Sequence, residues 1–366
     1  MLLSLAPILL LVALLSTSVA LFGSDASYGP NQVALVVAAG ATMLVGWRRG
    51  MSWQQIQDGM VGAITVSIMP MMILLSVGAL IGSWIISGTV PGMIFYGLQL
   101  LNPDIFYAAS AVICALASLS LGSSWTVAGT LGIGLMGIAT TYGLSPAITA
   151  GAIISGAYFG DKLSPLSDTT NLAAAAVGVD LFEHIKNMLW TTLPAFALAL
   201  LFFAIIGSEG AAAPDDITRI RAALSDQFAI TPWVLSPLVL MLAMIYFKIP
   251  AYPAILLCTL CGTAYGAVFQ PEVVRTMALT AHPESPAPLL QGLWMALFSG
   301  YQSPADMDQL SQLLDKGGLA SMLNTIFLIL TAMTFGGLLD STGILRQLLD
   351  LVLKGVKRTG DLILAT

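Results

Sequence analysis

The chain has 366 residues, of which 57% are hydrophobic and only 9% are charged. Soluble domains carry roughly 25% charged residues, so this composition excludes a water-exposed globule and indicates an integral membrane protein. The 13 basic and 19 acidic residues give a formal charge of -6, which provides no positive field and excludes nucleic acid as a partner.

Uncharged apolar segments divide the chain into candidate membrane spans, because a bilayer core of about 30 Å takes about 20 helical residues. The sequence therefore predicts an all-α, multi-spanning membrane protein. In chain order the expected spans are Leu2–Leu21, Gln32–Trp47, Met60–Ile86, Ile105–Leu121, Trp125–Thr140, Pro146–Phe159, Leu189–Ile206, Pro232–Phe247, Tyr252–Phe269 and Leu319–Leu339.

Basic residues next to these spans predict the orientation of the chain. Arg48 and Arg49 directly follow the second span, so the positive-inside tendency places them and the amino terminus in the cytoplasm. Lys354, Lys357 and Arg358 place the segment near the end there too. We expect four parts: N-terminal spans (1–58), a first transporter repeat with a polar ion-site motif (59–207), connecting spans and loops (208–318), and the start of a second repeat (319–366).

A faint internal repeat supports this division. Residues 81–87 can be aligned with residues 335–341, and each stretch closes a long apolar helix. The basic residues predict opposite directions for these two helices, which is typical of inverted-topology transporter repeats. The second copy has barely begun at Thr366, so we expect the second repeat to be incomplete in this chain.

The uncharged stretch Ile105–Gly160 is too long for one crossing. Its 56 residues would make about 84 Å of straight helix. Breaks at Gly122–Trp125 and Thr141–Pro146 leave pieces that suit half-helices or a re-entrant hairpin. Since non-helical backbone is tolerated at membrane depth only where protein or a water-filled path satisfies it, these breaks predict a lined cavity.

A dense polar run, residues 161–171, follows these pieces. Besides Asp161, six oxygen-bearing side chains lie within it: Ser164, Ser167, Asp168, Thr169, Thr170 and Asn171. Neutral oxygens with one carboxylate suit a small alkali cation, and a carboxylate withdrawn from water also binds a proton more readily. Asp168 is the first candidate to alternate between sodium and proton, with Thr169 and Asn171 as further sodium ligands. Asp161 is the second candidate.

Other readings of this run stay open. Asp161 and Lys162 could form a surface ion pair, and the run could be an ordinary turn that caps a helix through Asp168 or Thr169. Lys162 would make Asp161 a poorer proton carrier by pairing with it, or would attract a substrate carboxylate. In the earlier break, Ser123, Ser124 and Thr126 could face the run across a hairpin. We expect His184 to be a solvated interface residue.

Residues 155–173, with residues 180–185 after them, resemble the central motif of the NhaC-type sodium/proton antiporter family. The resemblance implies a multi-spanning transporter of the ion-transporter superfamily, with two inverted repeats, broken helices and polar hairpin tips that meet at the substrate. The family includes exchangers that couple sodium and protons to organic acids such as malate and lactate.

We therefore expect a sodium/proton antiporter that works by alternating access in a bacterial cell membrane. The reaction is vectorial, so we expect no enzymatic activity and no cofactor besides the transported ions. The expected partners are the sodium ion, the proton, the lipid bilayer and, in a homodimer, a second copy of the chain. The alternatives are a sodium- and proton-coupled organic-acid exchanger, in which Lys162 and the Ser123–Ser124 break bind the anion, and a non-transporting membrane scaffold.

Overall fold

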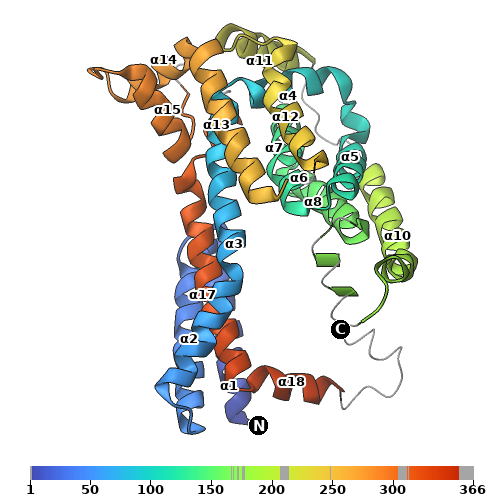
Figure 1. Cartoon of the computed structure of the whole chain (residues 1–366), viewed down its shortest axis with the longest axis vertical. Coiled ribbons are helices and arrows are strands. Elements are labelled where there is room, and N and C mark those ends of the chain that lie inside the picture. The colour runs from blue at the N-terminus through green and yellow to red at the C-terminus, as the bar shows by residue number, and fades with distance from the viewer. Residues whose placement is uncertain are drawn as a thin grey trace. The chain divides into compact units, whose positions relative to one another are not determined.

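The computed structural model describes residues 2–165, 167, 169–170, 173–174, 178–206, 214–247, 249–303, 311 and 313–353. All regular elements of these residues are helices (Figure 1), so the all-α prediction is confirmed. Seven of the described helices are long and apolar enough to cross a membrane, or eight if residues 217–227 and 232–244, bent by 89°, form one span. The protein is therefore a multi-pass membrane protein.

The described α-helices range in length from 6 residues in α6 to 34 residues in α3. Their bounds are α1 Leu2–Phe22, α2 Pro30–Arg48, α3 Trp53–Ile86, α4 Thr89–Leu100, α5 Phe106–Leu121, α6 Ser124–Gly129, α7 Leu131–Thr141, α8 Pro146–Leu163, α10 Leu181–Ile206, α11 Pro214–Gln227, α12 Ser236–Tyr246, α13 Ala251–Phe269, α14 Pro271–Ala281, α15 Pro288–Phe298, α17 Leu323–Ser341 and α18 Ile344–Leu353.

Both predicted breaks in the long uncharged stretch are present. Gly122 ends α5 with a φ of 68°, and Gly143 follows α7 with a φ of 69°, a left-handed conformation that glycine adopts readily. A further break at Thr130 divides the predicted span 125–140 into α6 and α7. Each of these two helices is shorter than a bilayer crossing, so the prediction of broken helices holds and that of a single span is wrong.

Five of the described α-helices lie outside the predicted spans. α4 follows α3 after a turn at Gly88, α11, α14 and α15 lie in the part 208–318, and α18 follows α17. α14 buries Val273, Val274 and Met277, so it packs into the fold and is not a free loop. At 10 to 14 residues these helices are too short to give the signal of a membrane span.

The residues divide into two compact units. Unit 1 comprises residues 1–74 and 322–366, and unit 2 comprises residues 75–321. The four-part division expected from the sequence remains a prediction.

In unit 1, α17 runs parallel to α2 (Figure 1). Gln32, near the start of α2, donates a hydrogen bond to Asn324, near the start of α17 (3.2 Å), and Arg49 donates to the Thr342 carbonyl oxygen at the other ends (2.6 Å). The turn at residues 49–52 then reverses the chain into α3. α3 and α17 therefore run in opposite directions, as the sequence predicts for an inverted repeat, while the repeat itself stays a prediction.

In unit 2, the C-terminal part of α3 is surrounded by other helices. Trp84 is fully buried. Gly262 allows α13 to approach α3, since a Cβ atom at residue 262 would lie 3.1 Å from the Trp84 ring. Gly82 allows α15 to approach still closer, because a Cβ atom there would overlap the carbonyl group of Ala296. Glycines thus set the packing distance around this helix.

α5 and α8 pack equally tightly elsewhere in unit 2. A Cβ atom on Gly156 would lie 2.9 Å from the carbonyl carbon of Ala111, and one on Gly160 would overlap the Ala115 carbonyl oxygen. The Ser118 hydroxyl crosses the interface and donates a hydrogen bond to the Ala157 carbonyl oxygen (2.6 Å). This register brings the end of α8 next to the connection between α5 and α6.

Candidate functional site

The two polar breaks meet through one hydrogen bond. Ser124, the first residue of α6, donates its hydroxyl to Oδ2 of Asp161, in the last turn of α8, at 2.7 Å. Ser124 is only 5% exposed. The prediction that the Gly122–Trp125 break faces the 161–171 run is therefore confirmed for Ser124.

Local capping explains why Ser124, and not its neighbour, reaches the carboxylate. After the left-handed turn at Gly122, the Ser123 hydroxyl accepts a hydrogen bond from the Thr126 backbone N–H (3.3 Å) and lies 2.9 Å from the Thr126 hydroxyl. Ser123 therefore caps α6, as serine commonly does. Of the three break residues named from the sequence, Ser123 and Thr126 hold the helix start and Ser124 contacts Asp161.

The segment after α8 folds back onto the end of that helix. The Thr170 hydroxyl lies within hydrogen-bond distance of the carbonyl oxygens of Asp161 (3.2 Å) and Lys162 (3.1 Å). Ser167 accepts from the Thr170 backbone N–H (3.4 Å), and its hydroxyl lies 2.9 Å from that of Thr169. Ser164 is fully buried, and its backbone N–H donates to the Asp161 carbonyl oxygen.

These contacts bear on the alternative of a simple capped turn. The cap-like hydrogen bond comes from Ser167, whereas the sequence analysis named Asp168 or Thr169. Asp168 and Asn171 lie outside the described residues, so their predicted roles as sodium ligands stay predictions.

A pocket of about 370 Å³ opens beside the Asp161 carboxylate. Residues from α6, α8, α10 and the polar run line it: Ser124, Trp125, Tyr158, Asp161, Lys162, Thr169, Thr170, Ala173, His184 and Met188. The structure thus brings together five of the residues predicted from the sequence and adds neighbours from three helices.

His184 is the main pocket residue that was not predicted as part of the site. It lines the pocket with Met188, one turn further along α10, and its expected place at a solvated interface stays a prediction. The spacing of four residues puts both side chains on one face of the helix, and this was the available signal. Tyr158 and Trp125 gave no signal in the sequence, because aromatic residues are common at lipid-facing positions.

The expected ion pair between Asp161 and Lys162 is absent from the part of the chain that the structure describes. The two residues are consecutive on α8, and consecutive helical residues do not face each other. Asp161 accepts from Ser124, while Lys162 is exposed and lines the same pocket. The pocket therefore holds a carboxylate and an ammonium that are not paired with one another.

The oxygen atoms around Asp161 suit a hard monovalent cation. The carboxylate lies among the neutral hydroxyls of Ser124, Thr169 and Thr170, all of which line the pocket. Thiolate and imidazole clusters would indicate a transition metal instead. Among the described residues no group of three or more His, Cys, Asp or Glu side chains could hold one.

Comparisons with known proteins relate the chain to ion exchangers. A family model described as the Na+/H+ antiporter family matches residues 156–366. The chain is 37% identical over 345 residues to the Na(+)/H(+) antiporter NhaC of Alkalihalophilus pseudofirmus, covering 92% of this chain and 69% of that relative. It is 35% identical over 340 residues to the malate-2H(+)/Na(+)-lactate antiporter of Bacillus subtilis, with the same coverage of each chain.

A third relative is more distant. The chain is 31% identical over 377 residues to the arginine/ornithine antiporter ArcD of Halobacterium salinarum, covering 99% of this chain and 72% of that relative. No solved structure matches the chain.

Proposed function

Since this chain belongs to the Na+/H+ antiporter family, we propose that it exchanges sodium ions for protons at the pocket that contains Asp161 and Ser124. The observation that carries the proposal is the 2.7 Å hydrogen bond between these two residues. It joins two breaks in the helical backbone, and broken helices form the ion sites of many secondary transporters.

The carboxylate gives the pocket a way to exchange one cation for another. In its ionised form Asp161 attracts a sodium ion, and the hydroxyl oxygens of Ser124, Thr169 and Thr170 complete the ion's coordination. In its protonated form Asp161 no longer offers a negative charge to sodium. The two cations therefore compete for one carboxylate, and exposing it to each side of the membrane in turn produces exchange.

The Ser124 hydroxyl suits both states. Its O–H donates to Asp161 Oδ2 in the structure, and its oxygen lone pairs can accept a hydrogen bond once Asp161 carries a proton. A hydroxyl that both donates and accepts keeps the carboxyl group satisfied throughout the cycle. Asp168, with Asn171, remains a second candidate for the exchanging group.

Reconstituted proteoliposomes test the assignment. With an acid interior, addition of external sodium is expected to accelerate dissipation of the pH gradient in the wild type, and Asp161→Asn should abolish this response. Asp168→Asn, measured in parallel, separates the two carboxylates. If Asp161→Asn retains sodium-dependent proton movement while Asp168→Asn loses it, the exchanging group is Asp168.

Orientation and assembly belong to the same proposal. We place the chain in a bacterial cell membrane with its amino terminus in the cytoplasm, because Arg48 and Arg49 follow α2. The hydrogen bond from Arg49 to Thr342 supports this, since it places the end of α17 on the same side as the basic residues. A homodimer stays a prediction.

A second candidate function is exchange coupled to an organic acid. Lys162 and His184 line the pocket of Asp161, where their nitrogen atoms could bind a carboxylate group. Two relatives are named as exchangers of malate and lactate or of arginine and ornithine, which carry carboxylate groups. The same vesicles decide: a requirement for malate or lactate in the sodium-dependent response favours this function, and a full response without either favours simple exchange.

A further inference from the structure

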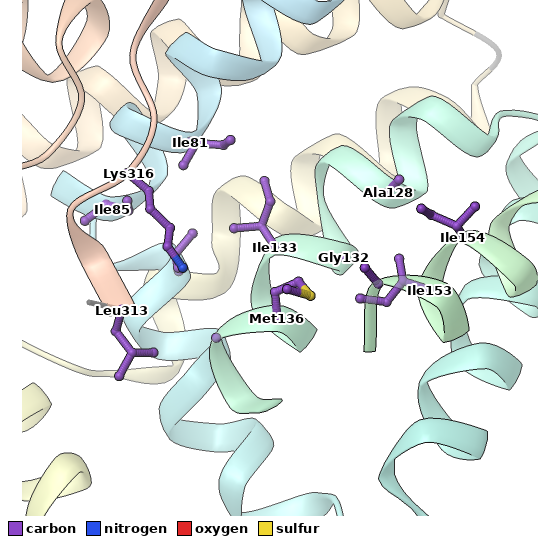
Figure 2. A pocket seen from close by; sticks show the side chains of 13 residues that line it. Ile81, Ile85, Ala128, Gly132, Ile133, Met136, Ile153, Ile154, Leu313 and Lys316 are labelled. Carbon is purple, nitrogen blue, oxygen red and sulfur yellow. The ribbon is translucent and has the colours of Figure 1, made fainter. Parts of the chain in front are cut away.

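A second pocket of about 370 Å³ lies in unit 2 and shares no lining residue with the pocket of Asp161. Its walls are aliphatic: Ile81 and Ile85 come from α3, Ile133 and Met136 from α7, and Ile153 from α8 (Figure 2). Lys316 is the one charged residue among the described residues that line it. The described lining of the pocket is therefore apolar apart from the ammonium group of Lys316.

The backbone holds Lys316 at this place. The Lys316 backbone N–H donates to the Leu314 carbonyl oxygen (2.7 Å), and the Tyr301 backbone N–H donates to the Lys316 carbonyl oxygen (3.1 Å). Gly318 N–H donates to the Gly78 carbonyl oxygen in α3 (2.6 Å). Gly317 and Gly318 have φ values of 87° and 81°, which side-chain-bearing residues rarely adopt. The loop that carries Lys316 is therefore hydrogen-bonded to α3 shortly after this residue.

The neighbouring carboxylate does not neutralise Lys316. Asp315 accepts hydrogen bonds from both the backbone N–H and the hydroxyl of Ser303, each at 2.7 Å. No ion pair joins these two described residues. Figure 2 shows the Lys316 side chain extending into the space between the α3 isoleucines and the Ile133 and Met136 side chains.

Lys316 is exposed, so its ammonium group stands beside the apolar walls where a dissolved anion can reach it. The pocket is also large enough for a small organic molecule, since ligand pockets begin at about 300 Å³. Aliphatic walls favour an apolar body, and the ammonium group favours a carboxylate. We infer that this pocket binds a small carboxylate with an apolar body, its negative group on Lys316 and its body against the isoleucines of α3 and α7.

This site is distinct from the proposed exchange pocket, so binding can be measured without transport. Isothermal titration calorimetry of the purified chain in detergent compares three compounds with similar apolar bodies. Phenylacetate is negatively charged, 2-phenylethanol is uncharged and 2-phenylethylamine is positively charged. We expect phenylacetate to bind about tenfold or more tightly than either, because only it carries a negative charge that can form an ion pair with the ammonium group.

Four variants locate the site. Lys316→Gln should weaken phenylacetate binding about tenfold or more, whereas Lys316→Arg should retain most of the affinity because it keeps the positive charge. Ala150→Leu, which fills the pocket from α8 without changing a charge, should weaken binding as well. Lys186→Gln is the matched control, because Lys186 is an exposed lysine of α10 that lies outside the lining residues of both pockets.

Equal affinity for phenylacetate and 2-phenylethanol would overturn the inference, as would wild-type affinity in Lys316→Gln. If Lys316→Gln does not fold, Ala150→Leu decides, and unchanged affinity in that variant excludes the pocket. Sodium-dependent proton movement is recorded separately. If Asp161→Asn still binds phenylacetate, carboxylate binding at Lys316 does not depend on the proposed exchange site.

Discussion

Gly160 and Ser118 lie so close together that a Cβ atom on Gly160 would come within 2.7 Å of the Ser118 Cβ atom on the neighbouring helix. Asp161 is the next residue, so this contact between α8 and α5 sets the position of the proposed exchanging carboxylate. Small residues at such crossings allow the close helix approach that is typical of membrane proteins.

The variant Gly160→Ala tests this dependence. The added methyl group must push α8 away from α5, which should lengthen the hydrogen bond between Ser124 and Asp161 and reduce the exchange rate about tenfold or more. The measurement is sodium-dependent dissipation of a pH gradient in proteoliposomes. Gly151→Ala is the matched control on the same helix, because nothing lies within 4 Å of its added Cβ atom. Equal rates for the two variants would argue that the crossing does not position the carboxylate.

Ser124→Ala removes the hydroxyl that contacts Asp161. We expect a higher KM for sodium, by about tenfold, because the variant loses one coordinating oxygen and one hydrogen bond to the charged carboxylate. Ser124→Thr should restore most of the sodium affinity, since it keeps a hydroxyl group. The initial exchange rate as a function of sodium concentration gives both values.

Ser120→Ala is the control for this pair. Its hydroxyl donates only to the Leu116 carbonyl oxygen of its own helix and is exposed. An unchanged sodium KM in Ser124→Ala, or the same rise in Ser120→Ala, would count against a direct role of Ser124.

Arg49→Gln tests the connection between the ends of α2 and α17. The Arg49 guanidinium donates to the Thr342 carbonyl oxygen (2.6 Å) and to Oε1 of Gln347 in α18 (3.0 Å). Hydrogen bonds from a charged group that remains partly exposed contribute about 1 kcal/mol, so the thermal unfolding midpoint should fall by a few degrees. Arg48→Gln, which alters the neighbouring exposed arginine, should leave the midpoint unchanged. Equal midpoints in the two variants would show that the Arg49 contacts add no stability.

The sequence alone determined the class of the protein and two of the breaks in its long uncharged stretch, while the break at Thr130 gave no signal. Charges are expensive in a lipid bilayer, so their spacing marks the spans, and a long uncharged stretch interrupted at Gly122 and Gly143 must break there. The polar run that begins at Asp161 was visible for the same reason, because seven oxygen-bearing side chains stand there between apolar segments. These features are local, and local chemistry is what a single sequence reports.

Only the tertiary structure decided which polar groups meet. Ser123 and Ser124 are equivalent in the sequence, but the cap formed by Ser123 and the glycine crossing of α8 leave Ser124 facing Asp161. His184 enters the pocket because of the way α10 packs, and Lys316 lines a second cavity because glycines allow its backbone to cross α3. Such contacts join residues far apart in the chain. Their geometry depends on small differences in the distance between packed helices, which no pattern of hydrophobic and polar residues encodes.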